Sequence, residues 1–345
     1  MRSKRTIWLT VVGLCILSLL VGAWVAPPLE AKEKEITLIW ATYYPPSYVL
    51  PGKPYAPIGD FVDNVNKLGE GKVKINAYWS GELLDARQLI PGLQRGTADI
   101  IGQTGTYTTG AWPVMAFAEL PFFWRSTESY CEHMKMGGDI RNIVDEEMER
   151  KHGMKLIAFA TITLEPLWLG NKRVEKPEDL RGLKIRSAGI GQAWALKAFG
   201  AAPIGMVSAE MYEGMSRGTI DGLLTVPGTI YARKLYEVTK YCLDGSFAAD
   251  SIAVVMKKEK WDALPRDVRD IITKAVKIFE EELPSYDLKR REEYFAEFRK
   301  GGMEIAKLSP EGEEAFRTVA RKAWENYAEK VGPELAEKIF KLAGH

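Results

Sequence analysis

Pro177-Glu178-Asp179-Leu180-Arg181-Gly182-Leu183-Lys184-Ile185-Arg186-Ser187-Ala188-Gly189 is the stretch that decides the interpretation of this chain. Its first four residues are typical of one short helical turn, which Gly182 ends. Residues 183–186 then alternate apolar and basic side chains, the period-two pattern of a strand with one buried face. Arg186 falls where that strand ends.

Arg186 is the first candidate site residue. In an open α/β sheet, ligands collect at the carboxyl ends of the strands. A guanidinium there presents a planar fork of donors that pairs with a carboxylate through two parallel hydrogen bonds. Because most arginines are exposed, the stretch alone also fits a surface arginine at the end of a strand. The rest of the chain has to decide between these interpretations.

Strands and helices alternate on both sides of this stretch, which predicts βαβ units, a largely parallel sheet and an α/β fold. The predicted strands are 36–40, 73–79, 99–102, 155–160 and 183–186, and the predicted helices are 58–68, 89–93, 192–199 and one from Ser208, which its hydroxyl caps. Gly96 is expected to end the helix at 89–93 in the left-handed conformation. We match residues 183–186 with 73–76, since each follows a Gly that closes a turn.

The pattern Arg-Gly-Thr-x-Asp occurs at residues 95–99 and again at 217–221, each time between a predicted helix and a predicted strand. Together with the matching context, it predicts pseudo-symmetry between two similar α/β domains. After residue 250 the character changes: a helical stripe at 268–279 is interrupted by Pro284, a charged helix resumes at 286–300, and Ser309 caps a terminal helix.

The chain of 345 residues is long enough for about two domains. A basic start, Met1-Arg2-Ser3-Lys4-Arg5, precedes an apolar run over residues 7–26. This pattern predicts a secretory signal at residues 1–31 and a periplasmic protein. Cleavage after Ala23 and an uncleaved anchor are alternatives.

Charge and cysteine content exclude several classes. Without residues 1–31, 44 basic residues face 45 acidic ones, so nothing recruits nucleic acid or an anionic membrane. Cys131 and Cys242 remain, and two free thiols are favoured over one disulfide. The three histidines form no catalytic set, and no metal or phosphate-loop motif occurs, so we expect no enzyme, no metal and no cofactor.

A binding cleft between two domains fits better, because such pockets combine aromatic walls with a few polar groups. The candidates are Tyr43, Tyr44, Gln103, Tyr107 and Trp168, which lie at predicted strand ends or in the loops that follow them. Gly189 is expected to give the backbone freedom beside Arg186. Each aromatic residue alone also fits a core position, but together with Arg186 they favour ligand binding.

The sequence resembles the periplasmic substrate-binding proteins of tripartite ATP-independent periplasmic (TRAP) transporters, of the DctP family. The resemblance spans nearly the whole mature chain and is carried by 177–186 and by Gly81-Glu82-Leu83-Leu84, Gly96-Thr97-Ala98-Asp99, Glu119-Leu120-Pro121-Phe122-Phe123, Gly200-Ala201-Ala202-Pro203, Glu210-Met211-Tyr212, Arg217-Gly218-Thr219-Ile220-Asp221-Gly222, Tyr236-Glu237-Val238 and Leu264-Pro265.

The resemblance implies two α/β domains joined by hinge strands, as in type II periplasmic binding proteins, with a long helix spanning both. It implies domain I at 32–162 with about 250–290 and domain II at 163–249 with about 291–345. It also implies a monomer that serves a small and a large membrane subunit, and makes Arg186 the arginine that clamps the ligand carboxylate. A ligand sensor that presents its closed form to a membrane receptor is the alternative function.

Two departures from the family pattern bear on the ligand. Many relatives carry another arginine about twenty residues before the clamp, where this chain has Leu164-Glu165-Pro166-Leu167-Trp168. Many carry an asparagine that touches the ligand, where Thr225 is expected to take over its hydrogen bond. Leu224 cannot supply the carboxylate with which some relatives hold a metal. With Leu223, Leu224 and Trp168 expected as walls, the sequence favours an organic monocarboxylate with an apolar or aromatic body.

Overall fold

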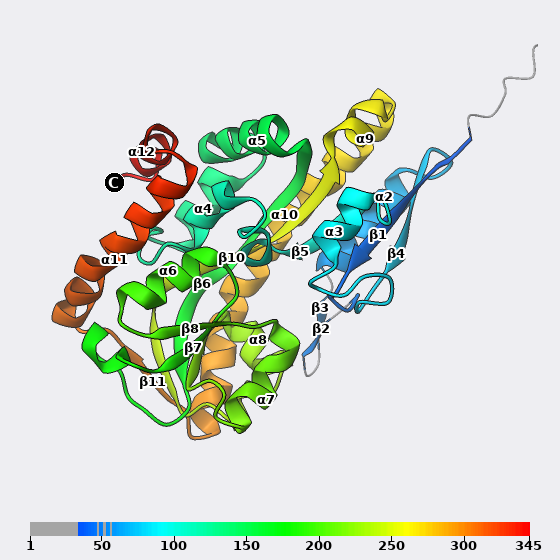
Figure 1. Ribbon diagram of the computed structural model, residues 1–345. Coiled ribbons are helices and arrows are strands. Elements are labelled where there is room, and N and C mark those ends of the chain that lie inside the picture. The colour runs from blue at the N-terminus through cyan, green and yellow to red at the C-terminus, as the bar shows by residue number, and fades with distance from the viewer. Residues whose placement is uncertain (1–33, 47, 51–52, 56) are drawn as a thin grey trace, which may run out of the picture. The chain divides into compact units, whose positions relative to one another are not determined.

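A mixed sheet of nine strands runs through the residues that this computed structural model describes, which are 34–46, 48–50, 53–55 and 57–345 (Figure 1). Its order is β4 (Val73–Tyr78), β1 (Ile36–Thr42), β5 (Ile100–Thr104), β10 (Tyr241–Lys257), β6 (Met154–Leu169), β9 (Gly222–Leu224), β7 (Lys184–Ser187) and β8 (Ala202–Gly205), with β11 (Glu304–Lys307) beside β10. A separate hairpin pairs β2 (Tyr48–Leu50) with β3 (Lys53–Tyr55). The predicted signal peptide lies outside the described residues.

Each end of the sheet is a parallel three-stranded unit. At one end β1 lies between β4 and β5, connected through α2 (Pro57–Leu68) and α3 (Leu89–Arg95). At the other end β7 lies between β8 and β9, connected through α6 (Ile190–Ala198) and α7 (Met211–Ser216). The predicted α/β fold with two similar units is therefore confirmed. The match of residues 183–186 with 73–76 is wrong, because β7 takes the central place that β1 takes at the other end.

The repeated Arg-Gly-Thr-x-Asp pattern forms the same loop in both units, with a left-handed glycine and an aspartate that accepts a backbone hydrogen bond. Gly96 and Gly218 follow α3 and α7 with φ of 78° and 66°, a backbone conformation that favours glycine. The carboxylate of Asp99 accepts a hydrogen bond from the Ile39 N–H at 2.8 Å, and that of Asp221 accepts one from the Lys184 N–H at 2.8 Å. Each aspartate thus ties the loop after a helix to the central strand of its own unit.

Two long antiparallel strands, β6 and β10, join the two units. The pairing of β10 with β5 covers residues 252–256, and the pairing of β6 with β9 covers residues 167–169. Between these contacts, residues 161–165 of β6 and 248–251 of β10 pair only with each other among the described strands. We call these residues the two-strand bridge. A register shift between Asp250 and Ser251 falls within it.

One helix, α10 (Arg266–Lys300), runs through Pro284 without a break, so the predicted interruption is wrong. A proline inside a helix removes one backbone hydrogen bond. Apolar side chains before and after it, from Val268 to Phe298, are buried, and α10 packs on β6, α2 and α8. Because packing stabilises protein helices more than propensity does, this burial carries the helix across the proline.

The remaining helices cover the sheet. The sequence predicted a serine N-cap for two helices, Ser309 for one and Ser208 for the other. Ser309 caps α11 as expected, since its hydroxyl accepts from the Gly312 N–H at 3.0 Å. Ser208 caps no helix: it starts a short 3-10 turn whose N-cap is Val207. No described helix has the length and apolarity to cross a membrane. The other helices are α4 (Thr127–Met134), α5 (Asp139–His152), α8 (Pro227–Ala232), α9 (Lys258–Ala263), α11 (Pro310–Val331) and α12 (Pro333–Leu342), and the 3-10 turns are η1 (Gly105–Thr108), η2 (Pro113–Glu119), η3 (Pro177–Leu180), η4 (Ser208–Glu210) and η5 (Leu235–Glu237).

A buried ion pair fixes α10 to α5 and β6. The guanidinium of Arg141, only 1% exposed, donates to Glu280 at 3.0 Å, to Asp145 at 2.8 Å and to the Leu156 carbonyl at 2.8 Å. The Glu280 carboxylate also accepts from the backbone N–H groups of Met136 and Phe159, both at 2.8 Å. Three elements therefore meet at one fully hydrogen-bonded pair of charges.

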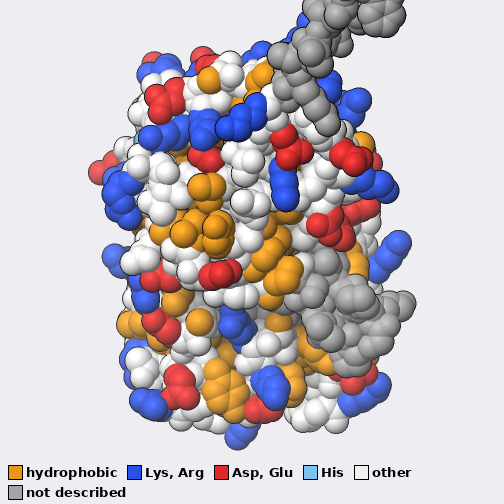
Figure 2. Space-filling view, turned by 90° about the vertical axis from the view of Figure 1, so that its right-hand side faces the viewer, with side chains coloured by type: hydrophobic (Ala, Val, Ile, Leu, Met, Phe, Trp, Pro, Cys, Tyr) orange, Lys and Arg blue, Asp and Glu red, His pale blue; other side chains and the backbone are white. Residues whose placement is uncertain are grey.

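The structure agrees with two expectations from the sequence, a balanced surface charge and two free thiols. The whole chain has 47 basic and 46 acidic residues, and Figure 2 shows both signs interspersed with hydrophobic side chains on the face drawn. Cys131 and Cys242 are free thiols, of which Cys242 is buried and Cys131 half-buried. The preference for two free thiols over a disulfide is confirmed.

Candidate functional site

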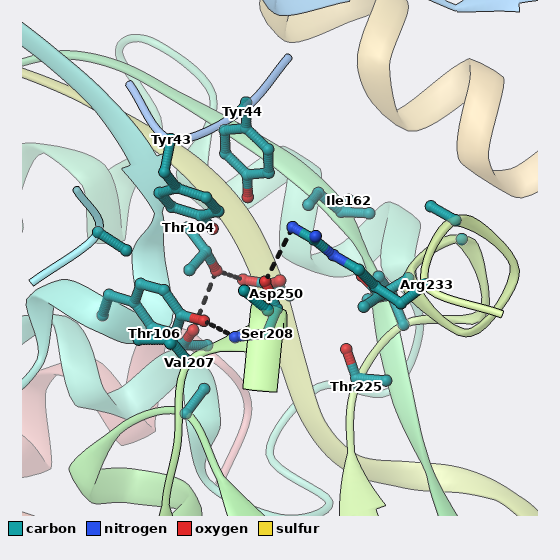
Figure 3. Close-up of a pocket in the computed structure, with 18 of the residues that line it drawn as sticks. Tyr43, Tyr44, Thr104, Thr106, Ile162, Val207, Ser208, Thr225, Arg233 and Asp250 are labelled. Carbon is teal, nitrogen blue, oxygen red and sulfur yellow. Dashed lines mark hydrogen bonds between the residues drawn. The ribbon is translucent and has the colours of Figure 1, made fainter. Parts of the chain in front are cut away.

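A cavity of about 740 Å³ lies beside the two-strand bridge and is lined by residues from both units (Figure 3). From the β1 unit come Tyr43, Tyr44, Thr104, Thr106 and Tyr107; from β6 and β10 come Ile162, Glu165, Asp250 and Ile252; from the β7 unit come Arg186, Val207, Ser208, Thr225, Val226 and Arg233; and α10 adds Leu283, Asp287 and Tyr294. Figure 3 shows Asp250 near the middle, between the two tyrosines and Thr225.

Arg186 lies at the end of β7 on this cavity and is only 3% exposed. Its guanidinium donates to the carbonyls of Met206 at 2.9 Å and Leu224 at 2.8 Å, and to the Tyr107 hydroxyl at 3.3 Å. Among the described residues, no carboxylate lies within ion-pairing distance of it. The surface-arginine interpretation is therefore wrong. This buried cation therefore makes no direct ion pair with a carboxylate in the described part of the chain, and from the cavity wall it can pair with an anion.

Tyr107 connects the two units across the cavity. Its hydroxyl accepts a hydrogen bond from the Ser208 N–H at 2.7 Å, besides the one from Arg186. Tyr43 packs against the Tyr107 ring at 5.5 Å and against the Tyr44 ring at 4.4 Å between centroids. The structure thus brings three of the four predicted aromatic residues together beside Arg186.

Three buried carboxylates line the cavity, and the sequence interpretation missed all of them: Glu165, Asp250 and Asp287. Glu165 is 1% exposed and Asp250 is 8% exposed. Burial raises the pKa of Glu165 well above its ordinary value and raises the pKa of Asp250 to about 6, while the charge of Arg186 opposes both shifts. Glu165 stands in the segment where many relatives carry an arginine, which was the available signal.

Two further guanidiniums, of Arg233 and Arg87, lie on the cavity wall. Arg233, after α8, reaches into the cavity and donates to the Ser208 hydroxyl at 3.5 Å (Figure 3). Arg87 of the β1 unit pairs with both carboxylate oxygens of Glu210 at 2.8 and 2.9 Å. This exposed pair spans the edge of the cavity from one unit to the other.

Trp168 does not line the cavity, contrary to the prediction. It is fully buried, donates to the Thr225 carbonyl at 2.8 Å, and packs edge-on against Phe295 and Phe298. Because successive side chains of a strand point to opposite faces, Trp168 faces away from the side on which Glu165 borders the cavity. Leu223 is buried in the same cluster. Neither residue is available as a wall for a ligand.

Of the three other predicted site residues, one lines the cavity and two do not. Thr225 is 4% exposed and lines the cavity, and its contact with a ligand stays a prediction. Gln103 is fully buried in β5 and is not part of the lining. Gly189 is not part of the lining either: a Cβ there would lie 1.9 Å from Glu119 Oε1, so the glycine allows close packing rather than ligand contact.

Glu119 fixes the helix that follows Arg186. Its Oε2 accepts from the N–H groups of Gly191 at 2.6 Å and Gln192 at 3.2 Å, at the start of α6. The side chain is fully buried, and this burial raises its pKa from 4.5 to about 8, against the effect of those two hydrogen bonds. The folded protein therefore holds a proton on Glu119 that the unfolded chain releases above about pH 4.5.

From this shift we predict a pH-dependent stability. Between about pH 4.5 and pH 8 the folded state binds more protons at Glu119 than the unfolded state, so the contribution of this group to stability falls as the pH rises. Glu119→Gln removes that titration. Urea unfolding from pH 5 to pH 9 should therefore show the variant gaining stability relative to wild type as the pH rises. A pH-independent difference would contradict the prediction, and Glu259→Gln, 80% exposed, is the control.

The site has the chemistry of a binding pocket. Among the described residues, no three His, Cys, Asp or Glu side chains are placed to hold a metal ion. An α/β sheet of two units, joined by two long strands with a polar cavity beside the bridge, defines a ligand-binding protein of the periplasmic binding protein type. The chain belongs to family 7 of the bacterial extracellular solute-binding proteins, the DctP family, whose model matches residues 55–330.

Known proteins of this family are similar over most of the chain. The 2,3-diketo-L-gulonate-binding periplasmic protein YiaO of Escherichia coli is 30% identical over 205 residues, 59% of this chain and 62% of its own. The C4-dicarboxylate-binding periplasmic protein DctP of Rhodobacter capsulatus is 25% identical over 284 residues, 81% of each chain. The crystal structure of DctP7 of Bordetella pertussis matches with a TM-score of 0.79 at 18% identity, covering 90% of this chain and 100% of that one.

Proposed function

We propose that this protein is the periplasmic solute-binding component of a TRAP transporter, which captures an organic monocarboxylate in the cavity and delivers it to the small and large membrane subunits. The observation that carries the proposal is Arg186, a buried guanidinium on the cavity wall with no carboxylate partner among the described residues. A bidentate carboxylate would supply the missing charge in the geometry that a guanidinium favours.

The relatives support a carboxylate as ligand. By their names, the Escherichia coli protein binds 2,3-diketo-L-gulonate and the Rhodobacter capsulatus protein binds C4-dicarboxylates, and the Bordetella pertussis receptor binds pyroglutamic acid. For this chain we propose a single carboxylate on a partly apolar body. That body would contact Ile162, Val226, Ile252 and the tyrosines, at about 25 cal/mol per Å² of apolar surface buried. Capture would bring the two predicted domains together about the two-strand bridge.

A thermal-shift screen tests the proposal. Panels of monocarboxylates, dicarboxylates, sugar acids and neutral analogues are added to the mature protein, and the melting temperature is recorded. A monocarboxylate at about 100 times its Kd should stabilise the folded state by about 2.7 kcal/mol, because it binds only that state. No shift with any carboxylate would contradict carboxylate capture. Tighter binding of a dicarboxylate such as succinate than of every branched or aromatic monocarboxylate would contradict the proposed ligand class.

A further inference from the structure

We infer that the ligand carries, besides the carboxylate for Arg186, a hydrogen-bond donor on its body, an N–H or O–H group that faces Glu165 and Asp250. The inference rests on the proposed function and specifies the ligand class for the same cavity. It is carried by the hydrogen bonding, the burial and the placement of these two carboxylates.

Each carboxylate has one oxygen fixed by the protein and one left over. Oε2 of Glu165 accepts from the Gln192 side-chain amide at 2.5 Å, and Oδ1 of Asp250 accepts from the Thr104 hydroxyl and from the Ser251 N–H at 2.8 Å. Among the described residues, no hydrogen bond is formed by Oε1 of Glu165 or Oδ2 of Asp250, and neither atom is sealed from solvent. Oδ2 of Asp250 is therefore an acceptor that the fold leaves for something in the cavity. Oε1 of Glu165 is a second free polar atom, and the raised pKa of this side chain places a proton there when the cavity is empty.

The two carboxylates lie together on the two-strand bridge. Glu165 pairs with Ala248, and Asp250 pairs with Thr163, so Glu165 and Asp250 are diagonal neighbours on one face of an antiparallel pair. Such neighbours are about 7–8 Å apart, within reach of a single small molecule. Both residues and Arg186 border the same cavity, so one ligand can meet all three.

Ligand binding removes water from these acceptors, and this sets the requirement on the ligand. A carboxylic acid with only an apolar body would leave Glu165 and Asp250 desolvated without a partner, which is costly. A second carboxylate would be repelled by the charge of Asp250, whose pKa of about 6 leaves it ionised at neutral pH. A hydroxyl, amide N–H or ammonium group replaces the lost water and satisfies the free oxygens. The pocket should therefore discriminate by the donor more than by the size of the body.

Isothermal titration calorimetry on wild-type protein tests this with matched acids that differ in the donor. The pairs are lactate and propionate, mandelate and phenylacetate, and pyroglutamate and its N-methyl derivative. In every pair of which one member binds, the acid with the donor should bind at least about tenfold more tightly. Alanine against lactate, at equal size, compares an ammonium donor with a hydroxyl donor.

Two variants test whether Glu165 and Asp250 cause the preference for acids with a donor. Glu165→Gln and Asp250→Asn keep the shape of the side chain and put an amide in place of the carboxyl group, and each should reduce the ratio within a pair to below about threefold. Glu259→Gln on exposed α9 is the control and should keep the wild-type ratio. Melting of the unliganded variants checks that they fold, and the wild-type ratios test the inference without them. Paired acids that bind wild-type protein within threefold of each other overturn the inference and leave the proposed function standing. If none of these acids binds, the pair is formed from the tightest carboxylate of the thermal-shift screen and its analogue without the donor. The proposed function itself fails if that screen finds no carboxylate that binds.

Discussion

Replacing Arg141 with alanine should lower the free energy of unfolding by about 3–5 kcal/mol, the usual effect of removing one partner of a buried ion pair. The guanidinium is 1% exposed and donates to Glu280, Asp145 and the Leu156 carbonyl. Its loss would leave the buried Glu280 carboxylate with backbone donors only. Urea-induced unfolding, followed by circular dichroism, measures the change.

Arg150→Ala provides the matched control, because Arg150 belongs to the same helix α5 but its side chain is 59% exposed and pairs with Glu147 at the surface. Exposed pairs contribute about 0–1 kcal/mol, so this variant should unfold close to wild type. If the two variants lost equal stability, the Arg141–Glu280 pair would not be the connection between α5, α10 and β6 that its contacts indicate.

Replacing Arg186 with alanine should weaken binding of the cognate carboxylate by about 2–5 kcal/mol, because the anion would then be buried without its counter-ion. Arg186→Lys should also bind poorly, since an ammonium is a point charge and cannot form two parallel hydrogen bonds in one plane. Isothermal titration calorimetry with the tightest ligand of the thermal-shift screen gives both values.

Arg181→Ala is the control for this experiment. Arg181 lies five residues earlier in the chain and is exposed, so its loss should leave the affinity unchanged. An Arg186→Ala protein that binds within threefold of wild type would remove Arg186 from the site. Since Arg186 also donates to the Met206 and Leu224 carbonyls, the melting temperature of the unliganded variant separates lost binding from lost folding.

The sequence was sufficient for the strands of the β1 unit and for β7, because their signals are local, but it did not predict β8. Period-two strands, helical stripes and the two Arg-Gly-Thr-x-Asp patterns depend on a few neighbouring residues, and Asp99 and Asp221 turned out to play the same part in both units. The course of α10 was not predictable in this way. Packing on β6, α2 and α8 outweighs the local effect of Pro284, and these contacts come from parts of the chain far apart in the sequence.

The difference between local signals and distant contacts also explains which residues of the candidate site could be predicted. Five of the predicted site residues do line the cavity, because strand ends and the loops after them can be located from sequence and lie where ligands collect in α/β sheets. They are Arg186, Tyr43, Tyr44, Tyr107 and Thr225. Trp168 was misplaced because its face of β6 depends on the exact register of a long strand. Asp250 was missed because β10, the strand that carries it, was not among the predicted strands. Arg233 was missed because it follows a short helix with no distinctive pattern. The predicted domain boundaries remain a prediction.

The pairing of β5 with β10 also determines the order in which this sheet can be completed during synthesis. Residues 100–104 of β5 emerge from the ribosome long before residues 252–256 of β10, which pair with them. Until then one edge of β5 has no partner, and unpaired strand edges promote aggregation. A chain that stops short of residue 252 would keep this edge exposed, so truncated forms of the protein should aggregate even when they contain the whole β1 unit up to β5. The last strand pairing of the β1 unit therefore forms only with β10, which is synthesised after the three strands of the β7 unit.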